Sequence, residues 1–453
     1  MPHQDPKTRI QNFDEVNLGY SENQVLQEAE RCMACKNPKC VSGCPVEIDI
    51  DRFLEAVRNR DYRKAILIIK EKNSLPAICG RVCPQETQCQ AGCILSKKGN
   101  AIEIGRIERF LADWEREHGV EVPQLPKPTG YKVAVVGSGP AGLTAAGDLA
   151  LLGHHATVFE SLHEPGGVLV YGIPEFRLPK AIVKAEVDYL KQLGVEFHLN
   201  AFIGQLYSFD DLFGQGYHAI LLASGAGLPR FLNVSGVNLV GSYSSNEFLT
   251  RVNLMRAYQF PDFDTPIIRG KVVAVVGGGN AAMDSARTAL RLGANNVYIV
   301  YRRSENEMPV RREEYHHAQE EGIEFQFLTQ PIELLGDDQG RVKAMKCLRN
   351  CLGEPDESGR CRPEPIEGSE FVMATDTVIF AIGVSANPSV PSCTPGLECD
   401  RWGDVIVDPE SLETSIAHVW AAGDITGGEG TVIAAAGEGK IAARNIHQYL
   451  LSL

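Results

Sequence analysis

The feature that most constrains the fold is a strand, a glycine-rich turn and a helix that recur in two places. Residues 132–160, KVAVVGSGPAGLTAAGDLALLGHHATVFE, place Gly137-x-Gly139-x-x-Gly142 between an apolar strand and a helix. In that context Gly137 permits the tight turn, Gly139 lets the backbone approach a pyrophosphate at the helix N-terminus, and Gly142 lets helix and strand pack closely. The stretch predicts a dinucleotide-binding unit, with a plain glycine turn in a parallel sheet as the alternative.

A second copy of this unit follows about 140 residues later: residues 271–303, KVVAVVGGGNAAMDSARTALRLGANNVYIVYRR, carry Gly277-x-Gly279-x-x-Ala282. The two units differ where the second strand ends, at Glu160 in the first and at Arg302-Arg303 in the second. A carboxylate accepts hydrogen bonds from an adenosine ribose, whereas guanidinium groups hold a 2′-phosphate. The first unit therefore predicts FAD, and the second predicts NADPH in preference to NADH, unless the arginines form a solvated strand end.

The C-terminal segment adds another feature of a flavin site. Gly423-Asp424 follow the strand HVWAA, and the glycines of GGEGT lead into a helix that starts near Thr431. By analogy with other folds, the Asp would contact the ribityl or pyrophosphate region of a flavin, and the helix N-terminus would present N–H groups to the reduced ring. The alternative is a glycine-rich loop without such a role. Two nucleotide sites on one chain predict a hydride relay from NADPH to flavin.

Eight cysteines lie in two short stretches of a helical N-terminal region that extends to about residue 120. Zinc sites usually combine CxxC pairs that are far apart, whereas four cysteines in a run that ends before proline are closer to ferredoxin-type sites. Because thiolates are soft anionic donors, the runs predict two [4Fe–4S] clusters, with structural zinc or spare thiols as alternatives. The spacing is Cys32-x2-Cys35-x4-Cys40-x3-Cys44-Pro and Cys79-x3-Cys83-Pro-x4-Cys89-x3-Cys93.

The N-terminal sequence and the overall composition narrow the expected cellular compartment and the classes of partner. The N-terminus MPHQDPKTRI lacks the basic and apolar pattern of a signal peptide, and no apolar run approaches the ~18 residues that span a bilayer. We therefore expect a cytoplasmic protein, in which thiols stay reduced and grouped cysteines are metal ligands rather than disulfides. A net charge of −14 argues against a nucleic-acid or anionic-membrane partner. Further cysteines without ligand spacing are expected to be structural: Cys347, Cys351, Cys361, Cys393 and Cys399.

Several stretches give the chain a resemblance to a known family: NSLPAICGRVCPQETQC, IGRIERF, GGVLVYGIPEFRLPK, YRRSENEMP and AAGDITGGEGTVIAA. Over essentially its whole length it resembles the small (beta) subunit of NADPH-dependent glutamate synthase. Relatives in that family include the large subunit of NADH-dependent ferredoxin:NADP oxidoreductase, sulfide dehydrogenase subunits and the N-terminal half of dihydropyrimidine dehydrogenase. The resemblance implies an α/β fold in which a helical iron–sulfur domain precedes two Rossmann-like nucleotide domains, arranged as in disulfide reductases.

The resemblance also implies a discontinuous flavin domain. We expect a helical domain with two clusters at 1–125, an FAD domain made of 126–240 and 378–453, and an inserted NADPH domain at 241–377. The proline-containing stretch HGVEVPQLPKPTG would link the first domain to the second. Because the flavin domain contains no redox-active CxxC, disulfide reduction is not expected.

For the clusters, the resemblance implies a more specific ligand set than the spacing gives. It assigns one cluster to Cys32, Cys35, Cys40 and Cys93. It assigns the other to Cys44, Cys83, Cys89 and, in IGRIERF, the non-cysteine ligand Glu108. Spacing alone counts Cys79 as a ligand, whereas the resemblance makes it a non-ligand, so the two interpretations differ.

For the nucleotides, the resemblance implies that Gly166-Gly167 and the segment YGIPEFRLPK line the flavin ring. The expected cofactor-binding residues are Gly137, Gly139, Pro140, Ala141, Gly142, Glu160, Gly166, Gly167, Leu169, Arg177, Gly277, Gly279, Asn280, Ala281, Ala282, Arg302, Arg303, Gly383, Gly423, Asp424 and Thr431.

The expected activity is electron transfer without a catalytic acid or base, because hydride transfer to a flavin depends mainly on positioning. NADPH would reduce FAD, and electrons would leave singly through the clusters to an electron-accepting partner subunit in a hetero-oligomer. That partner is the glutamate synthase large chain or, since NFDEVNLGYSENQVLQEAERC looks as close to that branch, the small FAD/[2Fe–2S] subunit of a bifurcating transhydrogenase. Met1 is followed by Pro2, not by the N-terminal cysteine of a glutaminase, so this chain alone is not expected to make glutamate. A non-catalytic scaffold is the remaining alternative.

Overall fold

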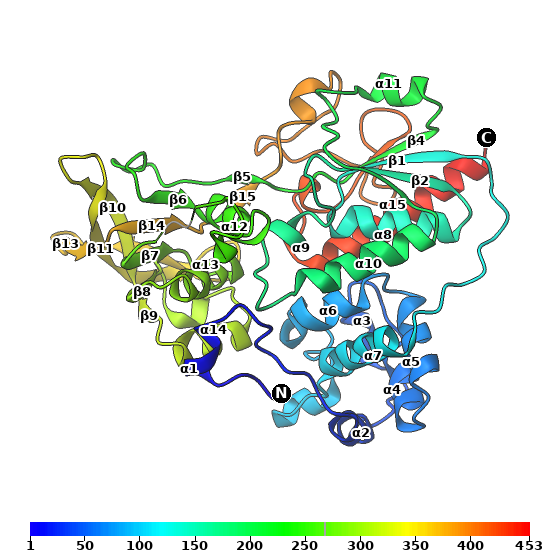
Figure 1. The fold of residues 1–453 in the computed structure, drawn as a ribbon, viewed down its shortest axis with the longest axis horizontal. Helices are drawn as coiled ribbons and strands as arrows, with labels where there is room; N and C mark the ends of the chain where they lie inside the picture. The colour runs from blue at the N-terminus through cyan, green and yellow to red at the C-terminus, as the bar shows by residue number, and fades with distance from the viewer. Residues whose placement is uncertain (267–268) are drawn as a thin grey trace.

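A helical N-terminal region and two parallel sheets with their helices make up the computed structural model, which describes residues 1–266 and 269–453. Figure 1 shows the N-terminal helices in blue and cyan beneath the first sheet and its helices, with the second sheet on the left. This arrangement confirms the predicted α/β fold with a helical domain ahead of two nucleotide-type domains. Residues 267 and 268, within the expected NADPH domain, lie outside the described part.

Local sequence signals account for the N-terminal helices. Ser21 caps α2, Asp61 caps α5 and Pro76 opens α6. The buried faces of these helices share a core that includes Phe53 and Ile66. The helices are α1 (Pro6–Arg9), α2 (Glu22–Glu30), α3 (Lys39–Ser42), α4 (Ile50–Arg58), α5 (Tyr62–Lys70), α6 (Pro76–Val82) and α7 (Ile104–His118), with short 3-10 turns at Gln85–Thr87 and Ile94–Lys98.

The first sheet has the strand order β16-β4-β1-β2-β3, and each neighbouring pair is parallel. Strand β16 comes from the C-terminal part of the chain and pairs Val419 with Ile220 of β4, so two separated parts of the chain build this sheet. Its elements are β1 (Lys132–Val136), α8 (Pro140–Leu151), β2 (His155–Phe159), α9 (Val168–Tyr171), α10 (Lys180–Gln192), β3 (Glu196–His198), α11 (Phe209–Gly214), β4 (Ala219–Leu222), β16 (Val419–Ala421) and α15 (Val432–Leu451).

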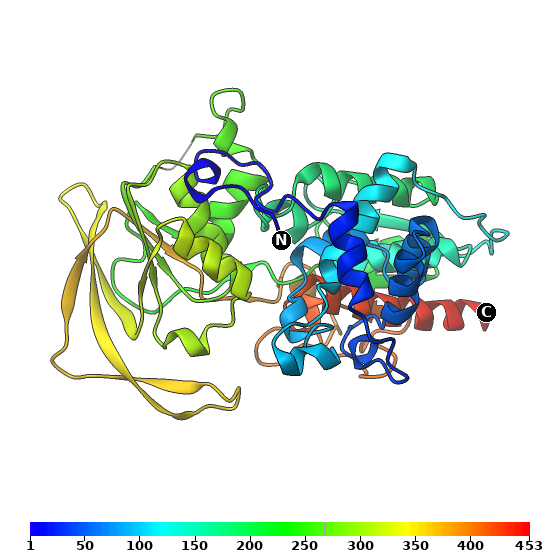
Figure 2. The same cartoon turned by 90° about the horizontal axis from the view of Figure 1, so that it is seen from below.

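The second sheet repeats this design, with the parallel order β6-β14-β7-β8-β9. An antiparallel sheet of β10, β11, β12 and β13 follows it at the far edge of the molecule, in yellow to orange in Figure 2. The elements are β6 (Ser242–Ser244), α12 (Ser245–Asn253), β7 (Val272–Val276), α13 (Asn280–Arg291), β8 (Asn296–Val300), α14 (Arg312–Glu320), β9 (Glu324–Gln326), β10 (Thr329–Gly336), β11 (Val342–Pro355), β12 (Cys361–Pro365), β13 (Phe371–Ala374) and β14 (Thr377–Phe380).

The chain passes between the two sheets through a small antiparallel ladder of β5 (Leu228–Pro229) and β15 (Val384–Ser385). Strand β14 pairs with β6 and β7, so residues 378–380 lie in the second sheet rather than in the first. On the other side of the ladder, Ser235 and Val240 bridge to the antiparallel sheet, so residues 235–240 also pack with the second unit. The expected limits of 241 and 377 therefore differ from the observed crossover, because pairing partners and not local pattern decide where a strand belongs.

The N-terminal segment reaches away from its own helices, and Figures 1 and 2 show α1 beside α14 of the second unit. The Arg9 side chain is fully buried there and pairs with Glu321 at 2.7 Å. Across residues 1–266 and 269–453, no helix has the length and apolar character needed to cross a membrane.

Candidate functional site

The first glycine loop has the geometry of a phosphate cradle. Gly137 has a φ of +108°, and a Cβ there would collide with the Ala223 carbonyl at the end of β4. A Cβ at Gly142 would collide with the Gly137 carbonyl. Gly139 precedes α8, and no heavy atom of the described residues lies within 4 Å of a Cβ built there. The loop is thus closed by the protein on one side and open at Gly139, which fits a pyrophosphate on the helix N-terminus.

Glu160 ties this loop to the chain that follows β2. One oxygen of the buried carboxylate accepts hydrogen bonds from the Ser138 N–H, at 3.0 Å, and from the Ser138 hydroxyl. The other oxygen accepts from the Leu162 N–H at 2.8 Å. The Ser138 hydroxyl accepts in turn from the Gly166 N–H at 2.8 Å. The Ser161 hydroxyl also donates to Glu160 Oε1, at 3.2 Å. A carboxylate offers about four acceptor sites, and all of them have donors within the chain, so a ribose hydroxyl would replace one of these donors.

Gly166 and Gly167 lie against the phosphate loop and introduce the segment with the expected flavin contacts. A Cβ at Gly167 would lie 2.9 Å from the Gly139 Cα, and its φ is +55°. Leu169 is fully buried, and its carbonyl accepts a hydrogen bond from the Lys180 amine at 3.1 Å. The same amine donates to the carbonyls of Ile173 and Leu178, and burial lowers the pKa of Lys180 to about 8. Sequence reasoning missed Lys180, although it closes the motif RLPK that the resemblance rests on.

The C-terminal segment returns to the same place. Gly423 has a φ of +82°, a Cβ there would lie 3.1 Å from the Ala141 Cβ, and its N–H donates to Glu438 at 2.7 Å. Burial and Glu438 raise the pKa of Asp424, and Thr431 caps α15. Tyr171 lies near Asp424, and burial, with Asp424 and Glu160, raises its pKa to about 12.

Glycines in the neighbouring loops also leave space that a bound molecule could fill. No described heavy atom lies within 4 Å of a Cβ at Gly139, Gly225, Gly383 or Gly430. The Gly383 carbonyl accepts a hydrogen bond from the Arg230 N–H across the β5–β15 ladder. The donor set and the open glycines together fit a flavin dinucleotide.

Arg177, an expected cofactor-binding residue, is paired with carboxylates of the second nucleotide unit. Its guanidinium donates to both oxygens of Asp284 in α13, at 2.8 and 2.7 Å, and lies 3.2 Å from Glu314 in α14. The side chain is therefore used between the two nucleotide domains. Sequence reasoning could not foresee this, because the motif around Arg177 says nothing of carboxylates on another sheet's helices.

The second glycine loop repeats the geometry of the first. Gly277 has a φ of +147° and would collide with the Ala381 carbonyl if it carried a Cβ, whereas Gly279 is open. Ala282 is buried where the first loop has Gly142, and Ala281 is exposed. Asn280 starts α13, and its side-chain oxygen accepts a hydrogen bond from the Arg311 N–H at 3.1 Å. This loop also fits a dinucleotide phosphate.

The two arginines after β8 lie in different surroundings. Arg302 is exposed, and its carbonyl accepts from the Asn350 side chain at 2.9 Å. Arg303 is buried: its Nε donates to the Cys361 carbonyl at 2.7 Å and its Nη2 to Asp356 at 2.6 Å. The expected pair of phosphate ligands is thus divided into one free guanidinium and one that holds the β11–β12 hairpin.

The N-terminal thiols form an inner and an outer group. In the inner group Cys44, Cys79, Cys83 and Cys89 are buried, whereas Cys32, Cys35, Cys40 and Cys93 of the outer group are half-buried. Burial, with Cys32 and Cys93, raises the pKa of Cys40 to about 11. Burial raises the pKa of Cys44 to about 11 and that of Cys89 further, and Glu108 contributes to both.

Glu108 lies among the inner thiols, and burial raises its pKa to about 8. Its Oε1 accepts a hydrogen bond from the Asn73 side chain at 2.8 Å, and Asn73 accepts from the Cys79 thiol at 3.7 Å. Sequence reasoning missed Asn73, which stands at the start of the motif NSLPAIC. Over 1–266 and 269–453, no group of three or more His, Cys, Asp or Glu residues could hold a single metal ion. Soft thiols with one carboxylate beside the inner group are a donor set that suits iron–sulfur ligation.

The inner group lies near α15, the helix that follows Asp424. A Cβ at Gly437 of α15 would lie 3.0 Å from the Pro45 carbonyl, directly after Cys44. In the outer group, the loops before Cys40 and Cys93 are in close contact. A Cβ at Gly92 would collide with the Lys39 carbonyl. The inner thiols are thus buried beside α15, and the half-buried outer thiols lie nearer the surface.

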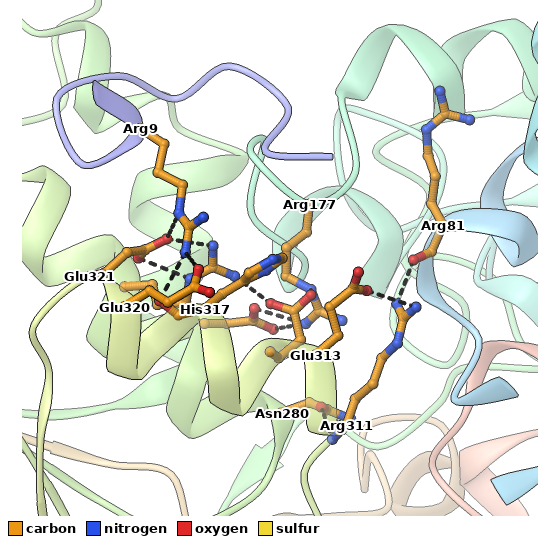
Figure 3. A network of polar contacts seen from close by, with 12 residues as sticks. Arg9, Arg81, Arg177, Asn280, Arg311, Glu313, His317, Glu320 and Glu321 are labelled. Atoms are coloured by element: carbon orange, nitrogen blue, oxygen red, sulfur yellow. Dashed lines mark hydrogen bonds and ion pairs between the residues drawn. The ribbon is translucent and has the colours of Figure 1, made fainter. Parts of the chain in front are cut away.

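A polar network, shown in Figure 3, fastens the second nucleotide unit to the N-terminal helices. Arg311 donates to the Arg81 carbonyl at 2.7 Å and to the Gln85 side chain at 3.1 Å. Arg9 donates to Glu320 at 2.8 Å and to Glu321 at 2.7 Å. The Arg9 and Arg311 side chains are both buried, and buried guanidinium groups need such partners, so these contacts favour one relative position of the units.

Comparisons with known proteins agree with this geometry. A family model described as pyridine nucleotide-disulphide oxidoreductase matches residues 131–439, and one described as dihydropyrimidine dehydrogenase domain II, 4Fe-4S cluster, matches residues 9–120. The glutamate synthase (NADPH) small chain of Halomonas elongata is 37% identical over 98% of this chain and 94% of its own length. The NADP(+)-dependent formate dehydrogenase subunit beta of Moorella thermoacetica is 38% identical over 91% of this chain, which spans 60% of that subunit.

Solved structures support the fold of the nucleotide domains. FprA of Mycobacterium tuberculosis, in complex with NADPH, has a TM-score of 0.59 at 22% identity, over 72% of this chain and 85% of FprA. Both the match of the oxidoreductase model over most of the chain and the full-length relative point to the same conclusion. The chain is an oxidoreductase that belongs to the family of the glutamate synthase (NADPH) small chains.

Proposed function

We propose that this chain is the electron-input subunit of a larger enzyme: it takes hydride from NADPH onto FAD and passes single electrons through two [4Fe–4S] clusters to a partner subunit. The observation that supports the proposal is the close approach of Gly437 in α15 to the Pro45 carbonyl, directly after Cys44, because α15 begins at the proposed flavin site. Bound FAD accepts two electrons as hydride and releases them singly, and clusters carry one at a time.

The chain's part in the first step is binding and orientation. Gly137, Gly139 and Gly142 with α8 would hold the FAD pyrophosphate, and Glu160 would hold the ribose. Asp424 would contact the ribityl or pyrophosphate region, and the α15 N-terminus would face the isoalloxazine ring. The Gly277–Ala282 loop would hold the NADPH pyrophosphate. We propose two nucleotide domains that meet at the β5–β15 ladder, after an iron–sulfur domain. The expected site residues other than Arg177 and Arg303 keep their proposed roles.

The clusters would be held as an inner and an outer site. The outer site takes Cys32, Cys35, Cys40 and Cys93. The inner site takes Cys44, Cys83, Cys89 and Glu108. Cys79 already donates to Asn73 and stays a non-ligand in this proposal. The half-buried outer site is then the exit for electrons.

A partner would dock over that exit. Met33 and Ile94 flank the outer cysteines and are 66% and 56% exposed. Exposed lysines surround them: Lys36, Lys39, Lys97 and Lys98. An apolar centre with a cationic rim fits a partner whose own redox site has an acidic rim.

The large chain of glutamate synthase is the first candidate for this partner. A different partner is the second candidate, because the formate dehydrogenase subunit is as similar as the glutamate synthase chain. We place the complex in the cytoplasm, where thiol ligands stay reduced.

Two matched variants test the relay. Because space is open beside Gly139 and beside Gly279, Val at either position should fold yet fill the place of a pyrophosphate. Gly139→Val should not bind FAD. Gly279→Val should bind FAD, but NADPH should no longer bleach the flavin rapidly under anaerobic conditions, as measured by stopped-flow absorbance. Wild-type protein that binds FAD but is bleached by NADH as fast as by NADPH would contradict the nucleotide assignment. Anaerobic co-purification then identifies the partner.

A further inference from the structure

The hairpin of β11 and β12 extends beyond the antiparallel sheet, as Figure 2 shows along the lower edge of the molecule. Its strands pair Asn350 with Pro365 and Leu352 with Pro363. At its turn the Asp356 N–H donates to the Arg360 carbonyl, and the Gly359 N–H donates to the Asp356 carbonyl, both at 2.8 Å. Asp356 and Arg360 therefore face one another across the turn.

This turn is fastened to the end of β8, the place where the second nucleotide unit carries its arginines. Asp356 accepts from Arg303 at 2.6 Å, and the Cys361 carbonyl accepts from the same guanidinium at 2.7 Å. At the base of the hairpin, the Asn350 side chain donates to the Arg302 carbonyl at 2.9 Å. The contacts at both ends of the hairpin thus reach Arg302 and Arg303, the second and third residues after β8.

The charges at this point do not balance. Arg303 pairs with Asp356, but neither Arg302 nor Arg360 has an ion pair among the residues that the structure describes. Arg360 is held over the turn by its Nε, which donates to the Ser358 hydroxyl at 2.9 Å. Partial burial, together with Arg303 and Arg360, lowers the pKa of Arg302, while Asp356 acts against this shift.

We propose that the turn of the β11–β12 hairpin completes the nucleotide site: Arg360 and Arg302 take the adenosine 2′-phosphate, while Arg303 and Asp356 position the hairpin. This inference rests on the proposed use of NADPH and adds the residue that would discriminate NADPH from NADH. Arg303, which sequence reasoning gave as a phosphate ligand, becomes a positioning residue.

The test compares two nucleotide fragments by isothermal titration calorimetry on the FAD-loaded protein, without turnover. Wild-type protein should bind 2′,5′-ADP more tightly than AMP. Arg360→Ala should weaken the binding of 2′,5′-ADP by about tenfold or more, because a charge-assisted contact is lost. The affinity for AMP should not change. Arg360→Lys should recover part of the loss. The exposed Arg362 lies two residues away, and Arg362→Ala is the matched control with no expected effect.

A double variant tests the positioning role. If Arg303 acts only by positioning the hairpin, the double variant Arg303→Ala/Arg360→Ala should bind 2′,5′-ADP no more weakly than Arg360→Ala does. Additive losses would overturn the positioning role, and unchanged 2′,5′-ADP binding in Arg360→Ala would overturn the inference as a whole. Wild-type protein that does not distinguish the fragments would instead overturn the proposed use of NADPH.

Discussion

The Arg177 guanidinium donates two hydrogen bonds to the Asp284 carboxylate, at 2.8 and 2.7 Å, and so joins the segment proposed to line the flavin to the helix after the second glycine loop. The two side chains are 7% and 6% exposed, and Glu314 lies 3.2 Å from Arg177. Because buried ion pairs lose in desolvation much of what they gain in attraction, the pair serves to hold the two nucleotide domains in one relation more than to add net stability.

Replacing Arg177 by Ala leaves the carboxylates of Asp284 and Glu314 buried without this partner. We expect the free energy of unfolding to fall by about 3–5 kcal/mol, as measured by urea denaturation, and flavin reduction by NADPH to slow in stopped-flow traces. Arg177→Lys keeps the charge but lacks the separate nitrogens that face Asp284 and Glu314, so its loss of stability should be smaller than that of Arg177→Ala. If Arg177→Ala unfolds at the same urea concentration and its flavin is reduced at the same rate as in the wild type, the ion pair does not fix the relative position of the two nucleotide domains.

Such partners mark the limit of what the sequence could predict. Both glycine loops were predictable because the strand, turn and helix of each are contiguous and their requirements are local. The position of Arg177 was not, since Asp284 lies 107 residues further along the chain, and Arg303 is held by Asp356, 53 residues away. Likewise the pattern of DTVIFAIG predicts a strand but not its neighbour. The strand pairs with β7, so it belongs to the second sheet rather than to the first.

The cysteines illustrate the same limit and give a second prediction. Spacing counts Cys79 with its neighbours, yet its thiol donates to Asn73 at 3.7 Å. Cys79→Ser retains a donor for Asn73, so we expect iron and acid-labile sulfide contents equal to those of the wild type. Cys83→Ser is the matched variant and should lose about half of the iron, one of two clusters. A fall to one cluster in Cys79→Ser would restore the interpretation from spacing.

Glu186 gives a prediction on pH. Burial raises its pKa from 4.5 to about 7, against the effect of Lys70 and of the Ala77 N–H, which donates to it at 3.1 Å. The folded state then holds this proton more tightly than the unfolded state, so stability is lost as pH rises from below 4.5 towards 7. Glu186→Gln removes the cost of ionisation, and its gain in stability should be about 1 kcal/mol larger at pH 8 than at pH 6.

Anaerobic denaturation at the two pH values measures this difference. Glu121 is exposed, so Glu121→Gln should change stability equally at both and serves as the control. A Glu186→Gln gain that does not grow with pH would mean that the carboxyl ionises in the folded protein as freely as in water.

Lys180 gives the last prediction, on flavin binding. Its amine donates to the carbonyls of Leu169, Ile173 and Leu178, and these three contacts shape the segment proposed to line the flavin. Lys180→Ala leaves the carbonyls without this donor, at about 1–3 kcal/mol for each one that stays buried and unpaired, so the segment should rearrange and FAD should bind more weakly. Lys184→Ala on the same helix removes an exposed amine that pairs with Asp188 and should leave FAD binding unchanged. Fluorescence of released FAD measures both dissociation constants, and equal values for Lys180→Ala and the wild type would mean that the segment keeps its shape without the amine.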